Sequence, residues 1–89
     1  MTDAYEVVWA RPAKRAINEM LPESVAAAAL ELILGPLREN PHRLGKPLRH
    51  PMEGLWSAPR ATYRVLYRID DEQRTITIDT IRHRRNAYL

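Results

Sequence analysis

Apolar residues follow a helical period in the N-terminal half of this 89-residue chain and alternate with polar ones in its C-terminal half. Residues 5–10, YEVVWA, are rich in β-branched and aromatic side chains and predict a short strand. Pro12 stands at a favourable helix-opening position, and apolar residues then recur every three or four positions up to Leu21, which predicts an amphipathic helix. Pro22 ends this helix.

A second helix is predicted at residues 23–34, because ESVAAAALELIL is rich in alanine and gathers its apolar residues on one face. Gly35 and Pro36 then kink or stop it. Residues 40–54 combine prolines, glycines, basic side chains and histidines without an apolar period, and predict a loop that crosses from the helices to a sheet.

Three further strands are predicted at residues 55–60, 62–69 and 74–82. The last two are joined by residues 70–73, a polar turn of hairpin length. The resulting order β-α-α-β-β-β predicts an α+β fold, in which a helical hairpin packs on one face of a curved, mainly antiparallel sheet.

Alternation within the strand at residues 62–69 determines which of its side chains are available for chemistry. Tyr63 and Val65 fall on the face that the helices would cover. Arg64, Leu66 and Arg68 fall on the opposite face. We therefore expect two arginines to stand on an open face of the sheet.

The composition is that of one globular domain spanning residues 1–89, with 45% apolar and 28% charged residues. Cysteine is absent, which excludes disulfides, zinc–thiolate clusters and a cysteine nucleophile and favours a reducing compartment. The chain shows neither a signal-peptide pattern nor an apolar run long enough to span a bilayer. We therefore expect a soluble, cytoplasmic protein.

Charge is unevenly distributed along the chain. Residues 1–40 carry four basic and six acidic side chains, whereas residues 41–89 carry ten and five, so the C-terminal half has a net charge of +5. The last nine residues, IRHRRNAYL, contain three arginines, a histidine and a tyrosine but no acidic residue. This asymmetry favours a polyanionic partner. A solvated chain end is the alternative interpretation of the final cluster.

Three stretches carry a family resemblance: NPHRLGKPLR, GLWSAPRATYRVLYRIDDE and IRHRRNAY. Their order and spacing, together with the helix positions, are similar to those of the RelE superfamily of bacterial toxins over nearly the whole chain. The resemblance implies a RelE-like fold and a toxin of a type II toxin–antitoxin system, which cleaves messenger RNA in the ribosomal A site and inhibits translation. It also implies a cognate antitoxin, whose acidic or helical segment covers the site.

Cleavage through attack of the 2′-hydroxyl needs a proton acceptor, cations that hold the phosphorane and a donor for the leaving oxygen, and it requires neither metal nor cofactor. A guanidinium group suits the phosphorane because it is planar, permanently charged and able to donate two parallel N–H hydrogen bonds to phosphate oxygens. The resemblance implies that Arg64 contacts the scissile phosphate and that Arg84 holds it or assists the leaving group. Tyr88 would stack on a base or hold the proton-transfer geometry. Arg60 and His83 complete the candidate catalytic set, His83 because it titrates near neutrality.

Each of these residues has a plainer interpretation. Arg64 would otherwise be a solvated arginine on a strand, His83 a structural histidine, and Tyr88 a tyrosine that pins the chain end to the core.

A second set of basic residues is expected to bind RNA phosphates without reading sequence. Lys46, Arg43 and Arg49 lie in the predicted loop and would add this affinity, unless the loop is simply solvated. Arg82 and Arg85 are assigned the same role. The sequence does not determine which face of the sheet they lie on, because the register at the end of the last predicted strand is not fixed.

The sequence departs from the family pattern where a general base would stand. Pro59 occupies a position that is commonly basic, and the loop lacks the glutamate of the related YoeB branch, so Glu53 is the nearest acid. The alternative function is a ParE-like inhibitor of DNA gyrase that does no chemistry. That branch lacks the C-terminal arginine and tyrosine set, so YRVLY together with HRRNAY favours the nuclease. A plain RNA-binding module is disfavoured because the chain has no phenylalanine.

Overall fold

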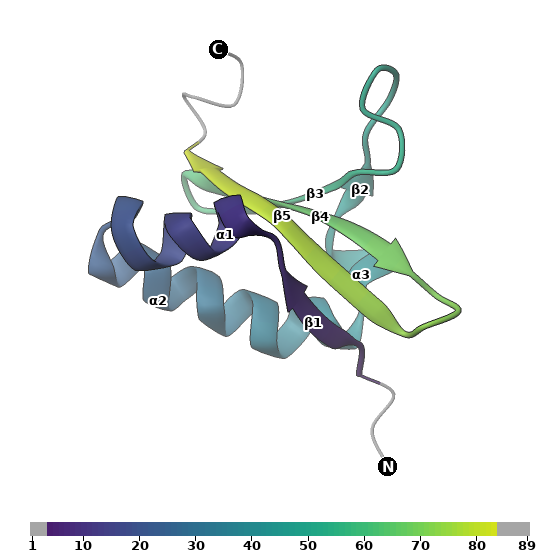
Figure 1. The fold of residues 1–89 in the computed structure, drawn as a ribbon, viewed down its shortest axis with the longest axis horizontal. Coiled ribbons are helices and arrows are strands. Elements are labelled where there is room, and N and C mark those ends of the chain that lie inside the picture. The colour runs from purple at the N-terminus through teal and green to yellow at the C-terminus, as the bar shows by residue number, and fades with distance from the viewer. Residues whose placement is uncertain (1–3, 84–89) are drawn as a thin grey trace.

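Three helical segments and a five-stranded sheet make up the described part of the fold (Figure 1). A computed structural model describes residues 4–83 of the chain. In chain order the elements are β1 (Glu6–Trp9), α1 (Arg11–Arg15), η1 (Ala16–Met20), α2 (Glu23–Leu32), η2 (Ile33–Leu37), α3 (Pro41–Leu44), β2 (Lys46–Pro47), β3 (Trp56–Arg60), β4 (Tyr63–Asp70) and β5 (Thr75–His83). The predicted α+β fold with a helical hairpin is therefore confirmed.

The sheet is mixed, with the strand order β1-β5-β4-β3-β2. β1 runs parallel to β5, and the other neighbouring pairs are antiparallel. α1 and α2 lie side by side on one side of the sheet, while the loop between β2 and β3 projects away from them (Figure 1). One face of the sheet is thus covered by helices, and we call the other the open face.

The helices begin and bend where the sequence has proline and glycine. Pro12 stands in the first turn of α1, where its missing N–H costs nothing. η1 and η2 are π-helical turns that continue α1 and α2. Gly35 has non-helical angles of φ −112° and ψ −105°, so the chain kinks before Pro36 and the helix does not stop there.

The core lies between the helices and the covered face of the sheet. Leu32, Ile33 and Leu37 from the second helical segment are at most 1% exposed. They pack in one apolar cluster with strand residues such as Val65 and Ile78. Burial of each such side chain stabilises the fold by about 1.5–3 kcal/mol relative to leaving it in water.

A β-bulge in β5 decides which of its residues reach the open face. Tyr67 pairs with Ile78 and Leu66 pairs with Thr80, so Asp79 is the extra residue between them. Strict alternation from Ile78 would have placed residue 82 on the covered face. The extra residue shifts the alternation by one and puts Arg82 on the open face instead.

The prediction that residues 40–54 form only a loop is wrong. This stretch contains the short helix α3 and the two-residue strand β2, which pairs with β3 at the sheet edge. Tertiary contacts hold both elements: the Tyr67 hydroxyl donates a 2.6 Å hydrogen bond to the Pro41 carbonyl. Such contacts leave no apolar period in the sequence, so periodicity could not reveal the two elements.

No helix within residues 4–83 is long and apolar enough to cross a membrane.

Candidate functional site

A pair of arginines lies on the open face, near one end of β4 and β5. Arg64 in β4 stands directly opposite Arg82 in β5, and the register places both side chains on the same face. Arg82 is exposed and Arg64 is partly exposed. Like charges in directly opposite positions of a sheet repel each other, and an anion bound between them would reduce that repulsion.

A hollow of about 460 Å³ adjoins Arg64. Its wall comes from α3, β2, β3 and β4 and consists of Arg43, Leu44, Gly45, Lys46, Pro47, Leu48, Ser57, Pro59 and Arg64. Three of these side chains are cationic and none is acidic. The hollow is therefore a positively charged recess beside the arginine pair, which is the arrangement that a phosphate group needs.

Close packing fixes the segment that carries Lys46 and Arg43. Gly45 is buried, and a Cβ there would lie 2.2 Å from the Tyr67 hydroxyl oxygen and 2.9 Å from the Ser57 carbonyl oxygen. Only glycine therefore lets the chain pass so close to β3 and β4. Burial raises the pKa of Tyr67 to about 12, so its hydroxyl stays protonated and keeps donating to Pro41.

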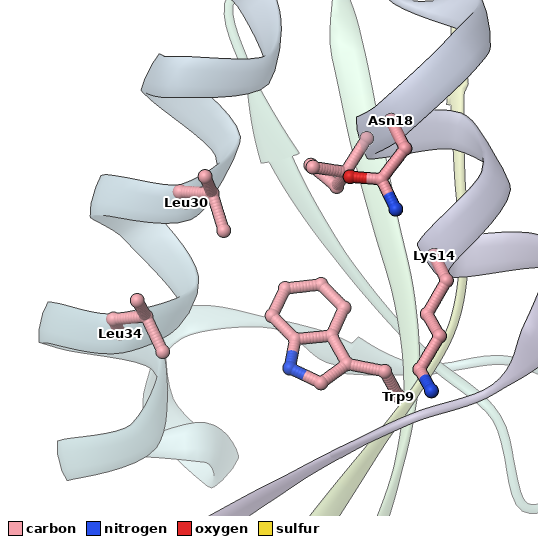
Figure 2. A pocket seen from close by; sticks show the side chains of 6 residues that line it. Trp9, Lys14, Asn18, Leu30 and Leu34 are labelled. Atoms are coloured by element: carbon pink, nitrogen blue, oxygen red, sulfur yellow. The ribbon is translucent and has the colours of Figure 1, made fainter.

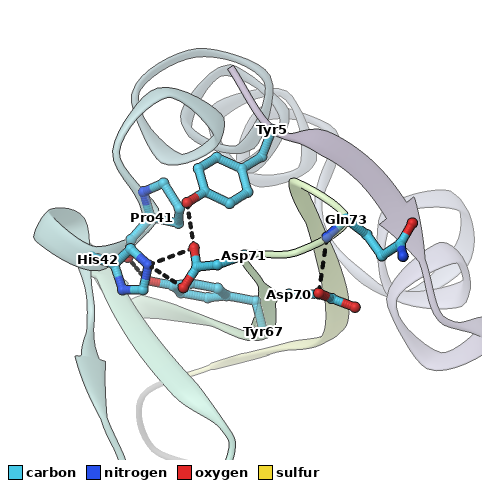
Figure 3. A network of polar contacts seen from close by, with 7 residues as sticks. All are labelled: Tyr5, Pro41, His42, Tyr67, Asp70, Asp71 and Gln73. Carbon is cyan, nitrogen blue, oxygen red and sulfur yellow. Dashed lines mark hydrogen bonds and ion pairs between the residues drawn. The ribbon is translucent and has the colours of Figure 1, made fainter. Parts of the chain in front are cut away.

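A polar network holds the other side of α3 (Figure 3). Asp71, in the β4–β5 turn, accepts a 2.5 Å hydrogen bond from the Tyr5 hydroxyl and lies 2.9 Å from Nε2 of His42. The hydrogen bond from Tyr5, followed by that from His42, lowers the pKa of Asp71, while the same bond to Asp71 raises the pKa of Tyr5. The network joins the N-terminal segment, α3 and the turn, and so it positions the helix that carries Arg43.

The structure separates two predicted catalytic residues from Arg64. His83 pairs with Tyr63 in the ladder, and their rings meet edge to face at 4.8 Å. His83 therefore shares the covered face with Tyr63, opposite to the arginine pair. Arg60 also pairs with Tyr63 and lines a hollow beside Ser24 of α2. The structure thus does not bring His83 or Arg60 together with Arg64.

Other predicted residues lie around the site or beyond the described part of the chain. Arg49 is exposed in the loop between β2 and β3 and does not line the hollow. In the same loop His50 lies 3.1 Å from Glu53. Predictions for three C-terminal residues fall outside residues 4–83: Arg84, Arg85 and Tyr88.

Ser57 is a residue of the hollow that the sequence analysis did not select. It is 6% exposed, and its hydroxyl has no hydrogen-bond partner within residues 4–83. Strand alternation could have found it, because Ser57 pairs with Leu66 and therefore shares the face of Arg64.

An apolar groove lies on the helix-covered side of the sheet (Figure 2). Its volume is about 550 Å³, and the indole of Trp9 stands between Leu30 and Leu34 on one helical segment and Lys14 and Asn18 on the other. Leu34 in this groove is 49% exposed. An exposed apolar groove of this kind is a candidate protein contact.

Residues 7–88 of the chain match the family described as ParE toxin of type II toxin–antitoxin system, parDE. A curated relative, Toxin RelE of Mycobacterium tuberculosis (strain ATCC 25618 / H37Rv), is 49% identical over 84 residues, which are 94% of this chain and 86% of the relative. Toxin RelG of the same organism is 44% identical over 84 residues, which are 94% of this chain and 95% of that relative.

A similar solved structure is the toxin–antitoxin complex RelBE2 of Mycobacterium tuberculosis. One of its chains superimposes with a TM-score of 0.86 and is 44% identical, and the match covers 94% of both chains.

Proposed function

The chain belongs to the RelE/ParE family of toxins of type II toxin–antitoxin systems, and on that premise we propose that it is a ribosome-dependent endoribonuclease. It cleaves messenger RNA in the A site through attack of the 2′-hydroxyl on the adjacent phosphate, without a metal, and so inhibits translation. The relatives that carry the names RelE and RelG support this choice over gyrase inhibition.

The observation that carries the proposal is the position of Arg64, which lies opposite Arg82 and lines the cationic hollow. Arg64 binds the scissile phosphate and stabilises the negative charge that grows on its oxygens in the transition state. Arg82 neutralises the same phosphodiester from the neighbouring strand. Fixed guanidinium donors at the developing charge supply a large share of such catalysis and require no proton transfer of their own.

Arg84 and Tyr88 keep the roles that the family resemblance implies, in phosphate or leaving-group binding and in base stacking. In the sequence Arg84 comes directly after β5, the strand that carries Arg82, and Tyr88 follows four residues later. Neither Arg60 nor His83 shares a face with Arg64, so we assign them no role in phosphate binding.

Contacts with ribosomal and messenger RNA come from the basic residues around the hollow. Arg43 and Lys46 line it, and Arg49 projects from the adjoining loop. Together with Arg85 they neutralise RNA phosphates, which makes binding dependent on salt but not on sequence.

A cognate antitoxin is the second partner. The similar chain of Mycobacterium tuberculosis was solved in a toxin–antitoxin complex. We assign the apolar groove around Trp9 and Leu34 to an apolar segment of the antitoxin, because this is the exposed apolar surface that a permanent partner would bury. An acidic segment of the same antitoxin then covers the cationic open face and prevents RNA from reaching Arg64.

One experiment distinguishes the nuclease from the gyrase inhibitor. The toxin is induced in cells that hold two copies of one transcript, only one of which has a ribosome-binding site, and RNA 5′ ends are mapped on both. Cuts within codons of the translated copy alone are the expected result. Intact transcripts together with halted DNA replication would overturn the proposal in favour of the ParE-like function.

A further inference from the structure

Ser57 places a hydroxyl group in the wall of the cationic hollow. The residue is 6% exposed, and less than 1 Å² of its Oγ atom is accessible. Within residues 4–83 this hydroxyl has no hydrogen-bond partner. Leaving a buried polar group unsatisfied destabilises a fold, and the great majority of such groups are paired. An unpaired hydroxyl at this place therefore calls for a role other than stability.

The neighbours of Ser57 indicate what could pair with it. In the sheet it stands between Lys46 of β2 and Leu66 of β4, its direct cross-strand partners. Lys46, Arg43 and Arg64 line the same hollow. The wall thus combines three cations with one uncharged O–H donor and contains no carboxylate. Such a set matches an anion with several acceptor oxygens, whereas a cation or an apolar group would find no partner in it.

We propose that Ser57 is a substrate-binding residue whose hydroxyl donates a hydrogen bond to a phosphate oxygen of the bound RNA, in a subsite next to Arg64. This inference rests on the proposed nuclease function and adds a residue to its site. Because less than 1 Å² of Oγ is accessible, the side chains around it must give way, and in this proposal the long side chains of Lys46 and Arg64, which line the same hollow, turn onto the entering phosphate when RNA binds. The backbone around Ser57 needs no change, because it is fixed by pairing on both sides.

A binding role and a structural role of the hydroxyl predict opposite effects on stability. If the hydroxyl serves RNA, Ser57→Ala removes an unsatisfied buried group, so the melting temperature stays equal or rises. If the hydroxyl served the fold, the same substitution would lower the melting temperature. Loss of one hydrogen bond to a charged phosphate weakens RNA binding or transition-state binding by about tenfold to a hundredfold.

The test compares wild type, Ser57→Ala and Ser24→Ala in a reconstituted translation system. Ser24 is an exposed serine of α2 on the helix side and serves as the matched control. We expect Ser57→Ala to cut the same codons as wild type, at least tenfold more slowly, with a melting temperature no lower than that of wild type. We expect Ser24→Ala to cut at the wild-type rate.

Two results would overturn the inference while leaving the nuclease intact: an unchanged cleavage rate for Ser57→Ala, or a slower rate accompanied by a lower melting temperature.

Failure of the nuclease proposal is seen separately, as a wild-type protein that cuts no translated RNA. For that case a 2′-O-methylated RNA trinucleotide, which cannot be cleaved, is titrated into each variant and amide shifts are followed by NMR. Weaker binding by Ser57→Ala with shifts around Ser57 and Arg64 supports the subsite, and wild-type protein that binds no trinucleotide refutes it.

Discussion

Two recesses on opposite sides of the sheet have similar volumes and different chemistry. The hollow on the open face measures about 460 Å³ and has three cations in its wall, and the groove on the helix side measures about 550 Å³ and is lined by four apolar side chains, Lys14 and Asn18. A phosphate binds where charge and hydrogen-bond donors converge, and an apolar peptide binds where water is easily displaced. Under the proposed function, the surface for RNA is therefore separate from the surface for an inhibitor protein, and substitutions should affect one without the other.

The largest effect is expected from Arg64→Gln. Loss of the guanidinium that stabilises the transition state should slow cleavage in a translation system by about a hundredfold to a thousandfold. Arg11→Gln, which removes an exposed arginine of α1, is the matched control and should cut normally. Antitoxin binding through the groove should persist in both variants. A fully active Arg64→Gln protein would remove Arg64 from the chemistry.

The reverse separation is expected from Leu34→Glu. A carboxylate in the groove must be desolvated when an apolar segment binds, so affinity for the antitoxin should fall by about tenfold to a hundredfold. Met20→Glu changes another exposed apolar residue, 69% exposed and outside the groove, and should bind normally. Calorimetric titration measures both affinities. Should Leu34→Glu bind as wild type does, the antitoxin does not use the groove.

The two surfaces also differ in how far the sequence could predict them. Alternation in β4 correctly placed Arg64 on the open face, because a regular strand keeps the period of two. The face of the sheet on which Arg82 lies could not be predicted in this way, because it depends on the bulge at Asp79. A bulge can be recognised only when two strands are paired. Sequence alternation therefore supplied one half of the arginine pair, and strand pairing was needed for the other.

Local patterns also failed where tertiary contacts form the site. α3 and β2 have no periodicity of their own and are held by the hydroxyl of Tyr67 and the small size of Gly45. The apolar groove escaped notice because its residues come from β1, the first helical segment and the second. Arg60 entered the catalytic set as the one basic residue of its stretch before Tyr63, and His83 because histidine ordinarily titrates near neutrality. Strand pairing turns both away from Arg64. Their catalytic role stays a prediction that this arrangement does not support.

A smaller effect is expected from Arg82→Gln. The substitution removes one of two facing like charges, so the free energy of unfolding should stay equal or rise by up to about 1 kcal/mol. Cleavage should slow by about tenfold, because one charge-assisted contact to the phosphodiester is lost. Urea denaturation and cleavage rates measure the two quantities. Opposite signs for stability and activity are characteristic of a binding site, and a loss of both would instead make Arg82 a structural residue.

The smallest effect on RNA cleavage is expected from Tyr67→Phe, which tests the support of the hollow. Without the hydroxyl the buried Pro41 carbonyl loses its donor, which should lower the free energy of unfolding by about 1–3 kcal/mol. α3 and Arg43 then lose one anchor, so cleavage should slow by only a few-fold, and binding of antitoxin to the groove should not change. α3 keeps its second anchor in the network of Asp71 and His42.

Tyr67 also predicts a pH dependence with a defined sign. Its pKa is raised to about 12 by burial, above the ordinary value of 10.0, so the folded state holds this proton more tightly than the unfolded state does. The stability that the hydroxyl contributes is therefore complete below pH 10.0 and is lost as the pH rises towards about 12. Urea denaturation of wild type and Tyr67→Phe from pH 8 upwards should show a constant difference at first and a shrinking one above pH 10.0. If the difference in unfolding free energy stayed constant at every pH, the Tyr67 phenol would be as accessible to solvent as in the unfolded chain. The Asp71 network would then be the anchor of α3.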